Sequence, residues 1–249
     1  MTQKPFTQPL SAQPLNLQQQ IAGEFRIDPL TSEQSADLPA FERVALLLRE
    51  NIISGNLYAG QPLLENELSE RCGASRNTLR EALRYLHGEG LVNYHQNRGV
   101  FVRQLDKRDV RDIFKVRRHL EILAVETNPQ VSPFHLNRML ALIEQAEQEA
   151  ENAAWRNVGT LSLRFHQSIV HMLGCQRFND FFSVILAQLR LLFASGPAER
   201  DFQYPWIARD REIYQLLHEG RTSEASQALQ VYLELSEKKL MQAFSLSTC

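Results

Sequence analysis

The stretch Ser75-Arg-Asn-Thr-Leu-Arg-Glu-Ala-Leu-Arg-Tyr-Leu86 decides the fold, because its spacing predicts a short helix with two faces of opposite character. Three leucines recur at steps of four and three, so we expect them to share one buried face: Leu79, Leu83 and Leu86. Three arginines recur at steps of four and form a second face: Arg76, Arg80 and Arg84. Ser75 stands at the N-cap position, where a hydroxyl accepts a backbone N–H and the helix N-terminus favours a phosphate.

A row of guanidinium groups beside a buried leucine face suits a helix that lies in a DNA groove. Arginine binds phosphate oxygens and also pairs with the O6 and N7 edge of guanine, in a geometry that lysine does not reproduce. The arginine row alone fits an ordinary solvated surface helix equally well. The choice between the two interpretations therefore depends on the segments on both sides of the helix.

Upstream, residues 65–72 predict a second helix, and Gly73-Ala74 predicts a tight turn from it into the arginine helix. We expect this upstream helix to bury three side chains: Leu64, Leu68 and Cys72. Helix, short glycine-containing turn and helix together form the arrangement of a helix-turn-helix.

Downstream, Gly90 ends the arginine helix, and residues 91–94 and 100–103 predict two short strands. The loop between them, residues 95–99, contains the Asn and Gly that a hairpin reversal needs. A helix-turn-helix followed at once by such a hairpin is a winged helix. Arg98 near the hairpin tip is then placed to reach a minor groove or a backbone phosphate.

Several spaced motifs occur in this region in a fixed order: Pro62-Leu-Leu-Glu65, Leu68-Ser-Glu70, Ser75-Arg-Asn-Thr-Leu-Arg-Glu-Ala-Leu83, Gly90-Leu-Val92 and Asn97-Arg-Gly-Val-Phe-Val102. Together they resemble the DNA-binding module of GntR-type bacterial transcription regulators, over residues 41–103. The resemblance implies DNA contacts by Ser75, Arg76, Thr78, Arg80 and the wing residues Asn97, Arg98 and Gly99, to which we add Asn77 and Arg84. Many members have Thr-Pro where this chain has Asn77-Thr78, which leaves the operator sequence open.

Composition indicates a globular chain of 249 residues, 43% hydrophobic and 22% charged, which is long enough for two cores. The net charge of -2 provides no bulk basic field, so affinity for DNA must come from local arginines, doubled in a dimer. The cysteines are sparse and lack a Cys-x-x-Cys pair, which favours reduced thiols in a cytoplasmic protein: Cys72, Cys175 and Cys249. The sequence predicts neither a membrane span nor a signal peptide.

The chain divides into three expected parts: a disordered arm at 1–39, a winged helix-turn-helix at 40–103 and an all-helical part at 104–249. The fold class is therefore mostly α, a winged helix joined to a C-terminal bundle of about six helices. Helical periodicity places those helices at 107–126, 133–153, 154–173, 177–193, 205–218 and 222–243. The longest loop of the helical part is then expected at Ser195–Tyr204.

Four of the predicted bundle helices carry polar or ionisable residues on or beside their apolar stripes: Arg117 and Glu121, Ser162 and His166, Asp210, and Tyr232. A charge buried without a partner is prohibitively costly, so these groups must pair with one another or bind something. One interpretation is an internal Arg117–Glu121 bridge with a hydrogen-bonded core histidine. The other is an effector pocket in which Arg117 receives the carboxylate of a small acid, supported by His166 and Tyr232.

The helical part resembles the FCD, or FadR-like, ligand-binding domain through four features: Val116-Arg117-Arg118 with Glu121, Phe165-His166, Leu216-Leu217 and Gly220. Many such domains hold a divalent metal with an aspartate, a histidine four residues later and two further histidines 22 apart. The corresponding residues here are Ser162, His166, Asp210 and Tyr232, of which only His166 keeps the ligand type. We therefore expect no obligate metal and no cofactor, with a metal-responsive regulator using His166 and Asp210 as the alternative.

These features predict a sequence-specific transcription regulator rather than an enzyme, since no nucleophile–base pair, glycine-rich phosphate loop or clustered metal ligands stand out. One recognition helix gives too little discrimination among genomic sites, so we expect a homodimer on a two-fold symmetric operator in double-stranded DNA. We expect a repressor whose operator affinity changes when a small organic acid binds in the helical part.

Overall fold

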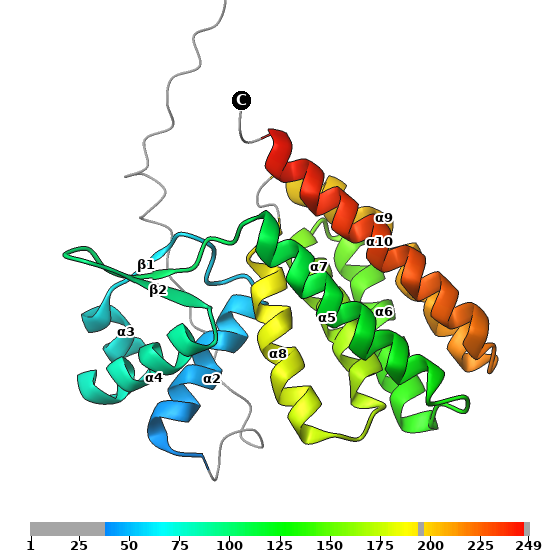
Figure 1. Cartoon of the computed structure of the whole chain (residues 1–249), viewed down its shortest axis with the longest axis horizontal. Coiled ribbons are helices and arrows are strands. Elements are labelled where there is room, and N and C mark those ends of the chain that lie inside the picture. The colour runs from blue at the N-terminus through cyan, green and yellow to red at the C-terminus, as the bar shows by residue number, and fades with distance from the viewer. Residues whose placement is uncertain (1–37, 194–196, 247–249) are drawn as a thin grey trace, which may run out of the picture.

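The computed structural model describes residues 38–193 and 197–246, so the predicted arm at 1–39 lies outside the described residues except for its last two (Figure 1). The N-terminal elements are α2 (Ala40–Ile53), β1 (Pro62–Leu63), α3 (Glu65–Arg71), α4 (Arg76–Gly88), β2 (Val92–His95) and β3 (Gly99–Val102). The helical part contains α5 (Lys107–Glu126), α6 (Pro133–Glu151), α7 (Trp155–His171), α8 (Gln176–Arg190), α9 (Pro197–His218) and α10 (Thr222–Leu246). This is the predicted fold class, a winged helix followed by a helical bundle.

Helix α4 forms where the leucine and arginine spacing predicts it. Its leucine face is fully buried, with 0% exposure at each position: Leu79, Leu83 and Leu86. The Oγ of Ser75 accepts the backbone N–H of Thr78 at 3.2 Å, which caps the helix. The upstream helix follows its prediction less closely, because Leu64 is its N-cap residue and is 58% exposed, whereas Leu68 is buried.

The wing is an antiparallel hairpin of β2 and β3, in which Tyr94 pairs with Val100. Its turn uses two residues of positive φ, Asn97 at 62° and Gly99 at 92°, as a tight hairpin reversal requires. A third strand, β1, pairs with the outer side of β3 and was not predicted, because two residues are too short to show alternation. The hairpin extends away from the helices at one end of the molecule (Figure 1).

The bundle packs α5 against α7, α8 and α10, and α6 against α7 and α9. Helix α2 of the winged-helix part packs against both α4 and α8, so it links the two parts (Figure 1). Helix α5 begins with a capping box in which the Asp106 and Asp109 side chains bind each other's backbone N–H groups. The start of α5 is therefore well fixed directly after the wing.

The prediction for α9 was wrong at its start, because the helix begins at Pro197 and includes most of the expected loop Ser195–Tyr204. Proline is favoured at the first helical position, which Pro197 occupies, whereas the predicted helix started at Pro205. Pro205 lies inside the helix and cannot donate to the carbonyl of Asp201. The Nζ of Lys239 on α10 donates to this carbonyl and also to that of Phe202 at 3.3 Å.

Replacing Lys239 with methionine is expected to lower the free energy of unfolding by about 1 kcal/mol, because the carbonyl of Asp201 loses its donor within the protein. Urea denaturation measures the change. Lys238→Met is the matched control, since Lys238 is exposed and adjacent. Equal losses in the two variants would show that the contact to the carbonyl contributes nothing.

Candidate functional site

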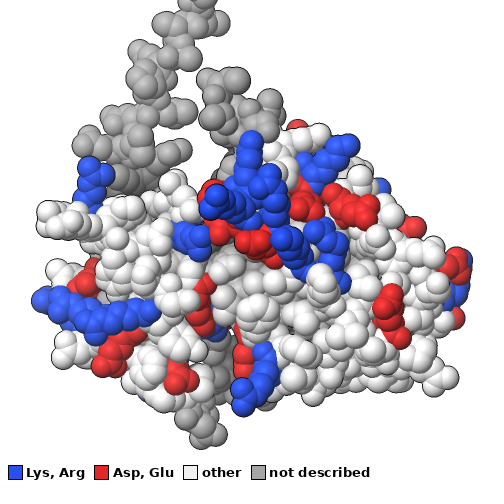
Figure 2. Space-filling view, viewed as in Figure 1, with Lys and Arg blue, Asp and Glu red and all other residues white. Residues whose placement is uncertain are grey.

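The arginine face of α4 is open to solvent. Arg76, Arg80 and Arg84 are all exposed, as are Ser75 and Asn77 at the start of the helix, and Thr78 is half-buried. The wing residues of the predicted set are exposed as well: Asn97, Arg98 and Gly99. Figure 2 shows basic side chains in a row over the region of α3 and α4. The structure thus leaves every residue of the predicted DNA-binding set accessible in part or in full.

The exposed arginines differ in their partners. Arg80 donates from Nε to Glu65 Oε2 at 2.8 Å, and both side chains remain partly solvated. Within residues 38–193 and 197–246, Arg76, Arg84 and Arg98 form no ion pair. These three guanidinium groups can therefore meet phosphate or base edges directly, whereas Arg80 must first leave Glu65. An exposed ion pair of this kind contributes only about 0.2–1 kcal/mol, so replacing Glu65 by DNA as the partner of Arg80 costs little.

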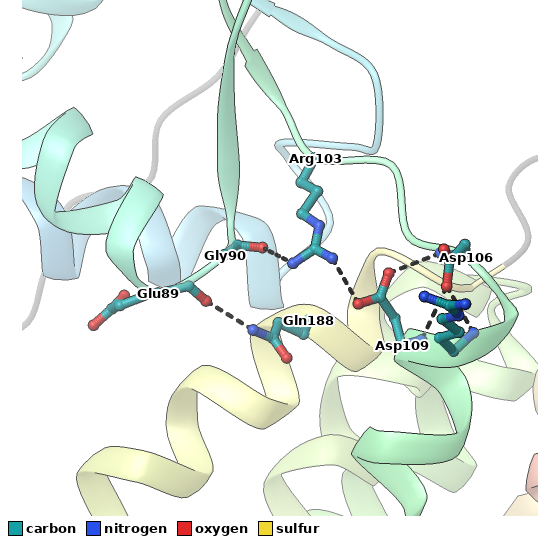
Figure 3. A network of polar contacts seen from close by, with 7 residues as sticks. Glu89, Gly90, Arg103, Asp106, Asp109 and Gln188 are labelled. Atoms are coloured by element: carbon teal, nitrogen blue, oxygen red, sulfur yellow. Dashed lines mark hydrogen bonds and ion pairs between the residues drawn. The ribbon is translucent and has the colours of Figure 1, made fainter.

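The end of α4 is fixed to the bundle through its backbone carbonyls (Figure 3). Gln188 on α8 donates from Nε2 to the carbonyl of Glu89 at 2.7 Å. Arg103, just after the wing, donates to the carbonyl of Gly90 at 3.4 Å and to Asp109 Oδ1 at 2.6 Å. Asp109 belongs to the first turn of α5, so the end of the arginine helix contacts both α5 and α8.

Two further features hold this junction. Arg49 of α2 pairs through two nitrogens with the Glu89 carboxylate, and both side chains are largely buried. Gly90 has a φ of 68°, and a Cβ there would lie 2.7 Å from a guanidinium nitrogen of Arg103. Sequence reasoning missed the junction, because its contacts join residues up to 99 positions apart and include main-chain oxygens.

Inside the bundle, the six predicted effector residues converge from α5, α7, α9 and α10, each at most 8% exposed: Arg117, Glu121, Ser162, His166, Asp210 and Tyr232. Glu121 is central, because its Oε1 accepts Arg117 Nε at 2.7 Å and its Oε2 lies 2.6 Å from His166 Nδ1. The Ser162 and Tyr232 hydroxyls are 3.3 Å apart. His166, expected at the margin of its stripe, is 1% exposed and lies 4.6 Å from the Tyr232 ring between centroids.

The charges of this cluster are set by burial and by the neighbouring ions. Burial by itself raises the pKa of Glu121, but the charges of Arg117 and His166 outweigh it and hold that pKa below its usual value. Burial opposes the charged form of His166, yet Glu121 and a contact with Asp210 raise its pKa overall. Burial raises the pKa of Asp210. These shifts favour the ionised form of Glu121 and the protonated forms of His166 and Asp210.

Three buried polar atoms of the cluster lack a hydrogen-bond partner within the described residues: Arg117 Nη2, His166 Nε2 and Asp210 Oδ1. The last two are 3.6 Å apart, which is too long for a hydrogen bond. Unpaired polar atoms are rare in protein interiors, and two donors and an acceptor here share one cluster. Beside them lies a cavity of about 10 Å³ lined by Ser162 and Asp210, which has room for roughly one water-sized group.

The donor set of the cluster does not fit a tightly bound metal. Among the described residues, no group of three or more His, Cys, Asp or Glu side chains is placed to hold a metal ion. Ser162 and Tyr232 contact each other at two of the positions where FCD domains commonly place ligands. His166 and Asp210 alone fall short of the three or four protein ligands of a zinc site.

A winged helix with an exposed arginine face, joined to a separate helical bundle, is the arrangement of a DNA-binding regulator. Comparison with known families agrees: residues 40–102 match the bacterial regulatory proteins of the gntR family, and residues 112–235 match the FCD domain. The chain belongs to the GntR family of transcription regulators and carries an FCD domain. Its relatives are transcription regulators, not enzymes.

The chain is similar to an HTH-type transcriptional regulator of Bacillus subtilis, YdhC, with 30% identity over 128 residues, 49% of this chain and 56% of the relative. It is 28% identical to a gluconate operon transcriptional repressor of Bacillus licheniformis over 69% of this chain and 72% of the relative. The chain thus spans little more than half the length of YdhC.

One solved structure supports this family, and a second shares the fold. A GntR regulator from Rhodococcus sp. RHA1 superposes with a TM-score of 0.74 at 31% identity, covering 82% of this chain and 98% of that one. Escherichia coli McbR/YncC shares the fold, with a TM-score of 0.72 at 20% identity over 83% of this chain and 99% of that one.

None of the helices in the described ranges has the length and apolar character needed to cross a bilayer.

Proposed function

We propose that this regulator is a cytoplasmic repressor that binds a two-fold symmetric operator as a homodimer and releases it when a small organic acid binds in the buried cluster. The three unpaired polar atoms of that cluster carry the effector part of the proposal. The repressor role is supported by a relative that is named as a repressor. The division into a winged helix at 40–103 and an effector and dimerisation part at 104–249 belongs to the same proposal.

On DNA, α4 is proposed to lie in the major groove with its arginine face towards the bases and phosphates. Arg76, Arg80 and Arg84 supply the charge, and the helix N-terminus with Ser75, Asn77 and Thr78 contacts a phosphate and nearby base edges. The wing contributes backbone contacts through Asn97, Arg98 and Gly99. A second copy related by symmetry supplies the specificity that one helix lacks.

In the bundle, a carboxylate is the ligand that the unpaired atoms suit best. Arg117 Nη2 and His166 Nε2 are both able to donate, and neither has a hydrogen-bond partner within the described residues. Burial raises the pKa of Asp210, so at a given pH its side chain carries less negative charge than an unperturbed aspartate. Charge-assisted hydrogen bonds to a carboxylate are about twice as strong as neutral ones. The name of the Bacillus licheniformis relative refers to the operon of a sugar acid, which is also a carboxylate.

The cavity beside Asp210 is far smaller than an organic acid, so binding requires the helices around the cluster to separate. Arg117 and Glu121 belong to α5, whose first turn holds Arg103 and through it the end of α4. A displacement of α5 therefore reaches the arginine helix through direct contacts. Changing the separation of the two α4 helices in a dimer would weaken the fit to both half-sites at once.

The proposal is tested with gluconate and other small acids as probes. The melting temperature of the protein and its affinity for the operator are measured with and without each acid. At least one acid is expected to raise the melting temperature and to weaken operator binding. Arg117→Lys keeps the charge but loses the planar guanidinium that can donate two parallel hydrogen bonds. It is expected to weaken acid binding about tenfold or more. Arg118→Lys is the matched control, since Arg118 pairs instead with Glu237 on α10.

Two outcomes would contradict the proposal. If no acid changes the melting temperature or the operator affinity, the effector pocket is wrong. If the titration of operator DNA with the protein gives one chain per duplex, the homodimer is wrong.

A further inference from the structure

A large second cavity lies between α2 and α4 on one side and α6, α7 and α8 on the other, separate from the buried cluster. Its volume is about 850 Å³, within the range of small-molecule sites, which are commonly 300–1,000 Å³. Residues of the winged-helix part and of the bundle both line it, for example Glu50 and Arg164. A ligand here would contact the DNA-binding part and the bundle at the same time.

The bundle wall of this cavity gathers basic groups without enough acids to pair them. Arg138 is the clearest case, because its exposed side chain forms no hydrogen bond or ion pair with the other described residues. Burial and the charge of Arg164 lower the pKa of Arg138. Burial, followed by the charge of Arg138, also lowers the pKa of His171 to about 4. The guanidinium groups of Arg138 and Arg164 therefore repel each other, whereas His171 is neutral at pH 7.

The acids that line the cavity are mostly engaged elsewhere. Glu89 pairs with Arg49, and Asp180 accepts from Gln176 at 2.7 Å. Glu50 binds Arg164, which also donates to Gln167 Oε1 at 2.8 Å. Glu42, in the first turn of α2, is the remaining acid of the lining. Arg138 is thus the arginine of the lining whose side chain has no acidic partner among the described residues, and the charge of Arg164 acts on it.

We propose that this cavity binds a small organic anion, a carboxylate or a phosphate ester, whose charged group lies between Arg138 and Arg164. The anion supplies the partner that Arg138 lacks and relieves its repulsion by Arg164. The neutral imidazole of His171 on the same wall offers a hydrogen bond to it. The site lies outside the cluster around Arg117, so the proposal does not depend on the effector pocket.

Binding at this site would act on the DNA-binding part through Arg164. This guanidinium now pairs with Glu50 on α2, and α2 packs against α4. An anion that engages Arg164 competes with Glu50 and weakens this contact between the two parts of the chain. The regulator would then respond to ligands at two places, one inside the bundle and one at its junction with the winged helix.

The full chain is tested by calorimetry with three probes at constant ionic strength: citrate, glucose 6-phosphate and inorganic phosphate. At least one probe is expected to bind, and Arg138→Gln is expected to weaken it about tenfold or more. Citrate binding alone identifies a carboxylate site, and binding by either phosphate identifies a phosphate site. Arg177→Gln, an exposed arginine of α8 outside the lining, is expected to bind as the wild type does.

Two further variants test whether the anion binds between Arg138 and Arg164 and not at the buried cluster. Glu50→Gln frees Arg164 and is expected to tighten anion binding several-fold. Arg117→Lys is expected to leave it unchanged, because Arg117 lies in the other site. The proposal is overturned if no probe binds, if Arg138→Gln and Arg177→Gln bind equally well, or if Arg117→Lys removes the binding.

Discussion

Replacing Arg76 or Arg80 with alanine is expected to weaken operator binding at least a hundredfold while the free energy of unfolding changes by no more than about 0.5 kcal/mol. Both side chains are exposed, so their removal leaves no cavity. A bidentate contact to a base is worth about 1–3 kcal/mol, and a symmetric dimer loses it twice. Arg80 also loses its pair with Glu65, which is solvated and contributes little.

Operator affinity measured over a range of salt concentrations, together with urea denaturation, checks this result. A variant that has lost only a phosphate contact also binds unrelated DNA less well and shows a smaller salt slope. Arg177→Ala is the control, since it removes an equal charge from an exposed position on α8. Wild-type affinity in both Arg76→Ala and Arg80→Ala would refute the role of α4 in DNA binding.

Replacing Glu121 with alanine is expected to lower the free energy of unfolding by about 3–5 kcal/mol. Glu121 is 0% exposed and accepts from Arg117 at 2.7 Å, and its other oxygen lies 2.6 Å from His166. Without this carboxylate, a buried guanidinium remains with no compensating charge, and the imidazole loses the neighbour that favours its protonation. Urea denaturation at neutral pH measures the loss.

Two companion variants identify the cause of that loss. Asp112→Ala, on the same helix, removes an exposed carboxylate 3.8 Å from Lys115 and is expected to change stability by no more than about 0.5 kcal/mol. Adding Arg117→Met to Glu121→Ala removes the uncompensated charge and is expected to recover part of the stability. A Glu121→Ala protein as stable as Asp112→Ala would mean that the buried pair contributes nothing.

The elements predicted well from sequence are those whose signals are local. The leucine spacing in α4 defines its buried face within 12 residues, and the Asn-Arg-Gly turn defines the wing. The start of α9 could not be found in this way. A proline normally marks a helix start, so Pro205 suggested that the helix began there. The Lys239 side chain, which binds the carbonyl of Asp201 that Pro205 leaves without a donor, lies 38 positions beyond Asp201 in the chain.

The candidate sites show the same limit. Polar residues on apolar stripes correctly predict that four helices send buried groups into one interior, but their pairing depends on geometry. Glu121 approaches His166, 45 positions away, as closely as it does Arg117 on its own helix. The cavity beside Arg138 gave no sequence signal at all, because its wall combines helices from both parts of the chain.

The two carbonyls at the end of α4 fix the rotational phase of that helix. Gln188 and Arg103 bind main-chain oxygens of Glu89 and Gly90, so these contacts persist whatever side chains follow the arginine row (Figure 3). Each residue turns an α-helix by about 100°. One residue inserted between Arg84 and Glu89 would therefore turn the arginines about a quarter of the way round the axis, so the spacing here can tolerate substitutions but not changes in length.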